Sequence, residues 1–141
     1  MKVIRLLSSG ILFLAAVALL SCGRQSPVDR YTEIMEELTE EIEKCQDISD
    51  ITRISNSRLG EESTAIIQEN ADYELTDSDK EKIKEANDRM MQAIFNKTVE
   101  LSGIPTEMHS RVQAQMNTTI EMFNAEIDNS KTLGDLSFAT H

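Results

Sequence analysis

The chain has 141 residues, a formal net charge of −11 and a sequence pI of about 4.6. A surface this acidic argues against binding nucleic acid or lying flat on anionic lipid, because both repel negative charge. The chain has no tryptophan and few aromatic residues, which disfavours a carbohydrate-binding platform of exposed rings.

The first segment has the order of a secretory signal. Lys2 and Arg5 precede a run of apolar residues from Ile11 to Leu20, and a small residue follows at Ser21. The run is shorter than the roughly 20 residues needed to span a bilayer, so we expect cleavage after residue 21. Cleavage removes only two charges, both basic, and the net charge of −11 becomes −13. The remaining 120 residues correspond to one domain.

The cleavage region Leu19-Leu20-Ser21-Cys22 resembles a bacterial lipobox, in which an aliphatic residue and two mostly small residues precede cysteine. The resemblance implies that the sulfur of Cys22 receives a diacylglycerol, that cleavage occurs before Cys22, and that the new amine is acylated. Leu20 departs from the more usual Ala, Ser or Thr. Several acyl chains anchor stably, because each buried CH₂ contributes about 0.8 kcal/mol. An ordinary secretory signal and a retained anchor are the alternatives.

A polar tether of residues 22–26 leads into the first predicted helix. Ser26 as N-cap, Pro27 at the first helical position and Asp29 nearby favour a helix start, and we expect the helix to reach about Gln46. One face is apolar at helical spacing: Val28, Tyr31, Met35, Leu38, Ile42 and Cys45. The stripe predicts that Cys45 is buried. A reactive or intermolecular thiol is the alternative.

The opposite face of this helix is acidic and carries Glu33, Glu36, Glu37, Glu40, Glu41 and Glu43. A cation site needs roughly six to eight oxygens that converge from a loop, whereas an outward helix face spreads them apart. We therefore expect a solvated face. Docking to a basic protein is the alternative.

A second helix is predicted from about Ser49 to Gln68. Gly60 lies inside it, and a glycine within a helix costs about 1 kcal/mol relative to alanine. We therefore expect a kink or a break at Gly60. Residues 70–75 are predicted to form a loop.

The third helix has the clearest boundaries. Thr76 is the predicted N-cap, Asp77 and Asp79 lie in the first turn, and Gly103 followed by Pro105 ends the helix. Its broad apolar stripe predicts contact with two neighbouring helices. The stripe consists of Ile83, Ala86, Met90, Met91, Ile94, Phe95, Thr98 and Leu101.

The fourth helix is predicted from Thr106 to about Asn129. Its apolar stripe consists of Met108, Val112, Met116, Ile120, Phe123 and Ile127. Residues 130–141 form a polar C-terminal tail, which is either mobile or packed down as an extension. No run has the period of a strand, so the fold class is all-α: an up-and-down bundle of three to four helices over residues 27–129.

The run from Glu69 to Ile83, ENADYELTDSDKEKI, follows an acidic helix and the joint KCQDI at residues 44–48. This order resembles small helical lipoproteins of Bacteroidota, over residues 31–103. The resemblance implies a helical lipoprotein and supplies no catalytic residues. Surface-exported lipoproteins of that phylum have an acidic run after the cysteine. Residues 23–26, GRQS, lack it, which favours the periplasmic side.

Few residues in the sequence indicate a catalytic or metal-binding role. The only histidines are His109 and His141, and no metalloprotease, nucleophile-elbow or phosphate-loop motif is present. We expect no catalytic residue, no cofactor and no metal site. Five methionines have helical spacing, which favours core packing, with an adaptable binding groove as the alternative: Met90, Met91, Met108, Met116 and Met122.

These patterns favour a non-enzymatic lipoprotein of the bacterial cell envelope, anchored through Cys22. We expect it to act as a helical interaction or structural module. Its expected partners are the membrane and another envelope protein, and not nucleic acid. The alternative function is carriage of a small apolar ligand or peptide in a groove between Met-rich helices.

Overall fold

The computed structural model describes residues 25–136, and the signal segment, Cys22 and residues 137–141 lie outside this range. The described chain confirms the all-α bundle. Its elements are α2 (Pro27–Lys44), α3 (Ile48–Ser55), α4 (Arg58–Glu69), α5 (Asp77–Ser102), α6 (Thr106–Asn129) and the short 3₁₀ helix η1 (Leu133–Asp135).

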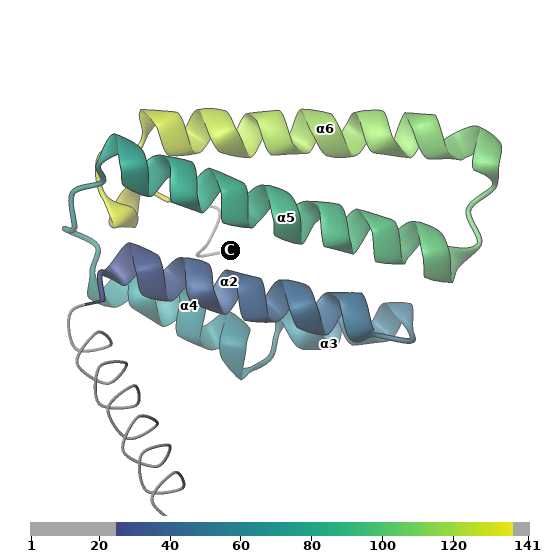
Figure 1. The fold of residues 1–141 in the computed structure, drawn as a ribbon, viewed down its shortest axis with the longest axis horizontal. Helices are drawn as coiled ribbons and strands as arrows, with labels where there is room; N and C mark the ends of the chain where they lie inside the picture. The colour runs from purple at the N-terminus through teal and green to yellow at the C-terminus, as the bar shows by residue number, and fades with distance from the viewer. Residues whose placement is uncertain (1–24, 137–141) are drawn as a thin grey trace, which may run out of the picture.

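The chain reverses direction after α2, after α4 and after α5, and α3 and α4 run the same way (Figure 1). α2 and α5 run one way, and α4 and α6 run the other way (Figure 1). α2 packs against α3, α4 and α5, whereas α6 makes its main contacts with α5. The bundle is therefore built around the α2–α5 pair, and α6 lies at its edge.

α2 begins as the sequence predicts and ends slightly earlier. The Oγ of Ser26 accepts a hydrogen bond from the backbone N–H of Asp29 at 3.1 Å, which caps the first turn. The helix ends at Lys44, two residues before the predicted Gln46. Cys45 follows as the C-cap and is buried, as its position on the apolar stripe predicts.

The predicted second helix is in fact two helices, and the expected break at Gly60 is wrong. α3 ends at Ser55 and α4 begins at Arg58, so Gly60 lies in the first turn of α4. A Cβ atom at Gly60 would lie 2.1 Å from the carbonyl oxygen of Ser55. Glycine is required here because it allows α4 to start against the end of α3, and not because it interrupts the helix.

The predicted boundaries of α5 are confirmed. The backbone N–H of Asp79 donates to Thr76 Oγ1 at 3.1 Å, and the backbone N–H of Thr76 donates to Asp79 Oδ2 at 3.0 Å. This reciprocal pair is a capping box. Gly103 ends the helix with a φ of +62°, which glycine adopts at little cost. α5 packs on both α2 and α6, as its wide stripe predicts.

The segment that follows α6 packs down on the loop before α5. The backbone N–H of Leu75 donates to the carbonyl of Lys131 at 2.8 Å, and that of Leu133 donates to Tyr73 at 3.0 Å. Leu133 and Leu136 are completely buried. As far as Leu136, the tail is therefore a packed extension and not a mobile end.

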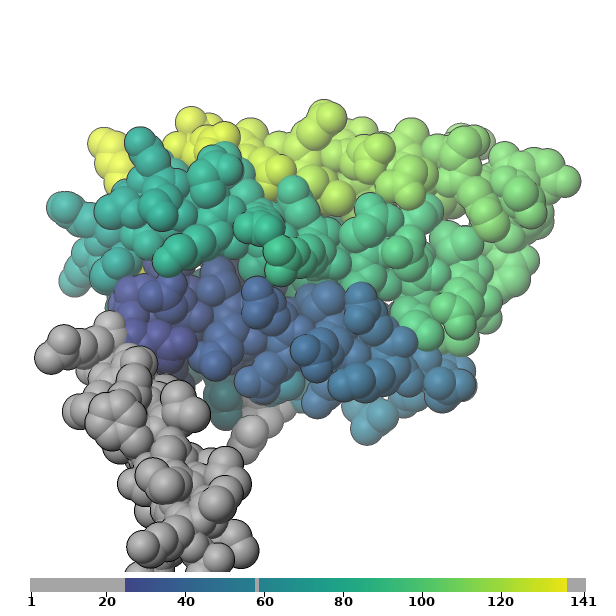
Figure 2. All heavy atoms as spheres, viewed as in Figure 1, coloured from purple at the N-terminus to yellow at the C-terminus, as the bar shows by residue number. Residues whose placement is uncertain are grey.

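α6 has the predicted bounds, but most of its apolar stripe is not buried. Ile127 is its one buried residue, and Met108 is 47% exposed. Figure 2 shows α2, α5 and α6 as adjacent bands on one face, with the α5–α6 turn extending beyond α2. At the opposite end of α6, Ile127 is buried and Lys84 Nζ of α5 lies 2.9 Å from Asp128 Oδ1. Because α6 packs mainly on α5, most of its apolar stripe stays partly exposed.

Candidate ligand-binding groove

An open groove of about 660 Å³ lies among the helices, and we call it the central groove. A volume of this size is typical of sites for small ligands. α2 contributes one side of it, α4 and the end of α3 contribute another, α5 contributes a third, and α6 contributes Phe123. Its main apolar residues are Tyr31, Met35, Leu38, Ile42, Ala65, Met90, Met91 and Phe123.

The groove uses the same face of α2 that builds the core. Tyr31, Leu38 and Ile42 are at most 4% exposed, and their spacing of seven and four residues places them on one side of the helix. These side chains therefore pack into the core and also line the groove. Packing in the core restrains these side chains, so the part of the groove that they line is rigid.

The wall contributed by α4 has polar residues whose hydroxyl groups are already bonded. Ser63 Oγ donates to the carbonyl of Gly60 at 2.8 Å, and Thr64 Oγ1 donates to the same carbonyl at 3.2 Å. Glu61 is the one charged residue among those that line the groove. The groove is therefore mainly apolar, with an acidic group on its wall.

One polar group in the groove is unsatisfied. Asn87 on α5 is 4% exposed, and its Nδ2 has no hydrogen-bond partner. A buried donor without a partner costs about 1–3 kcal/mol, and native structures contain few of them. Asn87 is therefore the residue of the groove whose presence the fold alone does not explain.

Replacement of Asn87 by leucine is expected to raise the free energy of unfolding of the ligand-free protein by about 1 kcal/mol. The two side chains have similar shapes, and the change removes the unpaired donor. Urea unfolding followed by circular dichroism measures the effect. Asn96→Leu is the matched control, because Asn96 lies on the same helix and is exposed. A loss of stability in Asn87→Leu would contradict the expectation.

The methionines divide between the groove and the surface. Met90 and Met91 line the groove, together with Met35, which the sequence analysis did not single out for this role. Met108 is 47% exposed and Met122 is 68% exposed. The predicted set of five methionines therefore contributes two residues to the site.

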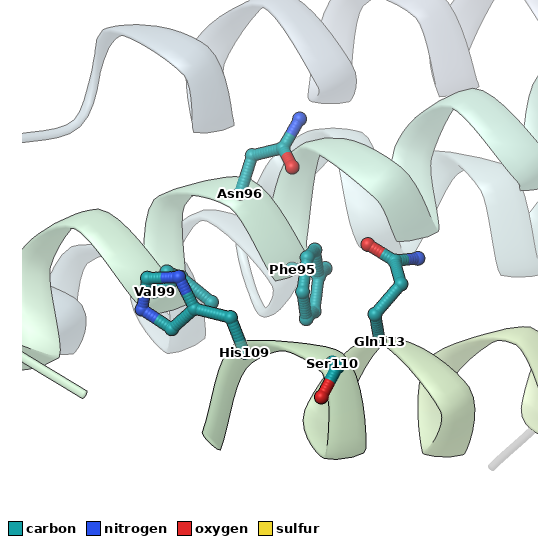
Figure 3. Close-up of a pocket in the computed structure, with 6 residues that line it drawn as sticks. All are labelled: Phe95, Asn96, Val99, His109, Ser110 and Gln113. Atoms are coloured by element: carbon teal, nitrogen blue, oxygen red, sulfur yellow. The ribbon is translucent and has the colours of Figure 1, made fainter. Parts of the chain in front are cut away.

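A second hollow, of about 450 Å³, lies between α5 and α6 near their turn. Figure 3 shows Phe95 and Gln113 extending into the space between the helices and the hydroxyl of Ser110 turned away from it. His109 Nε2 lies 2.8 Å from the carbonyl oxygen of Ile104. His109 therefore closes the turn between the helices. No acidic residue lines this hollow, and its one hydroxyl group, that of Ser110, is turned away from it.

The remaining candidates from the sequence do not assemble a site within residues 25–136. The glutamates of α2 are exposed, in agreement with a solvated face. No group of three His, Cys, Asp or Glu residues in that range is placed to hold a metal ion. No helix in the same range is long and apolar enough to cross a membrane. Cys22 and His141 lie outside the described residues.

Comparison with known proteins assigns neither a family nor a function to the chain. No family model matches the chain, and no curated protein or solved structure matches it.

The sequence analysis missed Asn87, although a signal for it exists. Asn87 lies four residues after Ile83 and three before Met90, and both belong to the predicted apolar stripe of this helix. A polar amide at that register is buried with the stripe. A buried amide of this kind either forms hydrogen bonds within the core or belongs to a binding site. The Nδ2 of Asn87 has no hydrogen-bond partner.

Proposed function

We propose that this chain is a lipid-anchored, non-enzymatic binding module of the bacterial cell envelope whose central groove holds a small apolar ligand. The observation that carries the proposal is the groove itself. It has a volume of about 660 Å³, and its surface is built mainly from apolar side chains of four helices. Ligand sites are typically apolar concavities with a few polar groups.

The groove favours carriage of a ligand over a purely structural role. A structural module gains stability by filling such a space, because a void forfeits packing contacts. Methionines suit an adaptable site, since their unbranched side chains repack around different shapes. Glu61 is the one charged lining residue, and the hydroxyl of Tyr31 is the only other titratable group in the lining. The proposal therefore includes no reaction.

The anchor in this proposal is the acylated Cys22, and the module faces the periplasm. The lipobox-like run Leu19-Leu20-Ser21-Cys22 supports the first point. The absence of acidic residues in positions 23–26 supports the second. The resemblance to small helical lipoproteins of Bacteroidota is consistent with both.

Replacement of Cys22 by serine is expected to move the protein from the membrane fraction to the soluble fraction. The lipid is attached through a thioether, which a hydroxyl group cannot form, and the acyl chains supply the membrane affinity. Cell fractionation and intact-mass measurement test the expectation. Cys45→Ala is the control, because it keeps the sulfur at position 22. A serine variant that still pellets with membranes would count against the anchor.

Replacement of Ala65 by tryptophan is expected to reduce the amount of ligand that copurifies with the protein by about tenfold or more. Ala65 lines the groove on α4, so the indole ring takes up the volume that the ligand requires. Native mass spectrometry of the full chain measures the retained ligand. Ala125→Trp on the exposed part of α6 is the matched control. A wild-type protein that retains no ligand would contradict the proposed function.

A further inference from the structure

The unpaired donor of Asn87 constrains the ligand. Its Nδ2 is buried and has no hydrogen-bond partner, and Asn87 is one of the residues that line the central groove. A donor in an apolar site binds strongly to a ligand that brings an acceptor, because the free protein leaves that donor unsatisfied. The ligand should therefore carry a carbonyl or hydroxyl oxygen.

Tyr31 offers a second polar group in the same groove. It is 2% exposed, and burial raises the pKa of its hydroxyl. The hydroxyl group is therefore neutral and keeps its capacity to donate. Asn87 and Tyr31 lie on the two central helices, α5 and α2, and both line the groove.

The charge of the groove excludes an anionic head group. Glu61 is the one charged residue in the lining, and the chain has a net charge of −11. A carboxylate or phosphate would lose its hydration without gaining a cation, which is costly in an apolar site. The acceptor of the ligand is therefore uncharged, as in an ester or an amide.

The remaining lining fits a flexible hydrocarbon chain. Met35, Met90 and Met91 contribute unbranched side chains beside Leu38 and Ile42, and such side chains adapt to a chain with many conformers. Under the proposed anchor, four peptide units join Cys22 to Ser26 and span at most about 14 Å. The start of α2, close to Tyr31, would then lie near the bilayer surface.

We infer that the central groove binds a neutral single-chain amphiphile, such as a monoacylglycerol. Its uncharged oxygen accepts a hydrogen bond from Asn87 Nδ2, Tyr31 supplies a second polar contact, and its acyl chain lies among the methionines. This inference rests on the proposed binding function and adds the chemical class of the ligand.

Photocrosslinking of the full chain in bacterial membranes tests the inference. One probe is a monoacylglycerol with a diazirine in its acyl chain, and the other is the free fatty acid with the same chain and diazirine. After irradiation, labelled peptides are mapped by mass spectrometry. The monoacylglycerol is expected to label groove peptides of α2, α4 and α5 about tenfold more than the fatty acid.

Asn87→Leu separates recognition of the head group from uptake of the chain. This variant is expected to keep labelling in the groove but to lose the preference for the monoacylglycerol. Asn124→Leu is the matched control, because Asn124 also has an unpaired amide atom but does not line the groove. Equal labelling by both probes, or an unchanged preference in Asn87→Leu, would overturn the ligand class and leave the binding function standing.

Two further outcomes test the occupancy of the groove. If neither probe labels the groove, both the inference and the proposed function fail. A chain that stops after Leu136 tests whether residues 137–141 occupy the groove instead. Unchanged labelling in this shorter chain supports the inference, whereas labelling that occurs only after the truncation would overturn it.

Discussion

Replacement of Leu136 by alanine is expected to lower the free energy of unfolding by about 3 kcal/mol. Leu136 is completely buried although it lies beyond the last long helix. Truncation of its side chain leaves a cavity that the surrounding helices fill only in part. Urea unfolding of the full chain, followed by far-ultraviolet circular dichroism, measures the loss.

Met122→Ala is the control for this experiment. Met122 lies on α6 and is 68% exposed, so its truncation should change stability by no more than about 0.5 kcal/mol. A small effect at both positions would show that the segment after α6 contributes no packing. A large effect at Leu136 alone would establish that the tail belongs to the core.

Replacement of Gly60 by alanine is expected to destabilise the protein by about 2 kcal/mol. Helix propensity alone predicts the opposite, a gain of about 1 kcal/mol. The close contact determines that the variant loses stability, because a Cβ at Gly60 would lie 2.1 Å from a backbone oxygen of Ser55. That oxygen is part of α3 and moves only if the helix moves. Thermal and urea unfolding both measure the change.

Gln68→Ala is the matched control for Gly60→Ala. Gln68 is exposed on the same helix, and alanine there is nearly neutral. A gain of stability in Gly60→Ala would contradict the tight junction between α3 and α4. Because the two expectations for this glycine differ in sign, a measurement of modest accuracy distinguishes them.

Helix boundaries were the features most accurately predicted from the sequence. Ser26, Thr76 and Gly103 each end or begin a helix where predicted. Capping depends on side chains and backbone groups within a few residues of one another, so the local sequence contains the required information. The ends of α6 were also predicted, at about Thr106 and Asn129, from the extent of its apolar stripe.

The break between α3 and α4 was misplaced because it depends on how two helices meet. Gly60 was interpreted by its intrinsic helix propensity. In the structure its importance comes from the nearby carbonyl of Ser55, which belongs to the preceding helix. A propensity describes one residue in an isolated helix, whereas this contact exists only after α3 and α4 are placed together.

The groove was only partly predictable for a related reason. An apolar stripe identifies the side chains that avoid water, but it does not tell which helix covers them. The spacing of the methionines favoured core packing, with a groove as the alternative. Met90 and Met91 line the groove, and Met90 also packs against the core, whereas Met108 is 47% exposed. Met108 is exposed because α6 lies at the edge of the bundle, and the position of α6 depends on its packing against α5.

Cys45 has a practical consequence for the state of Cys22. The chain contains two cysteines, and the core shields the thiol of Cys45, which is 6% exposed. A maleimide reagent that reacts only with accessible sulfur on the folded protein would therefore report on position 22. Uptake of the reagent before denaturation counts molecules whose sulfur carries no lipid. Uptake after denaturation adds Cys45 and serves as an internal standard.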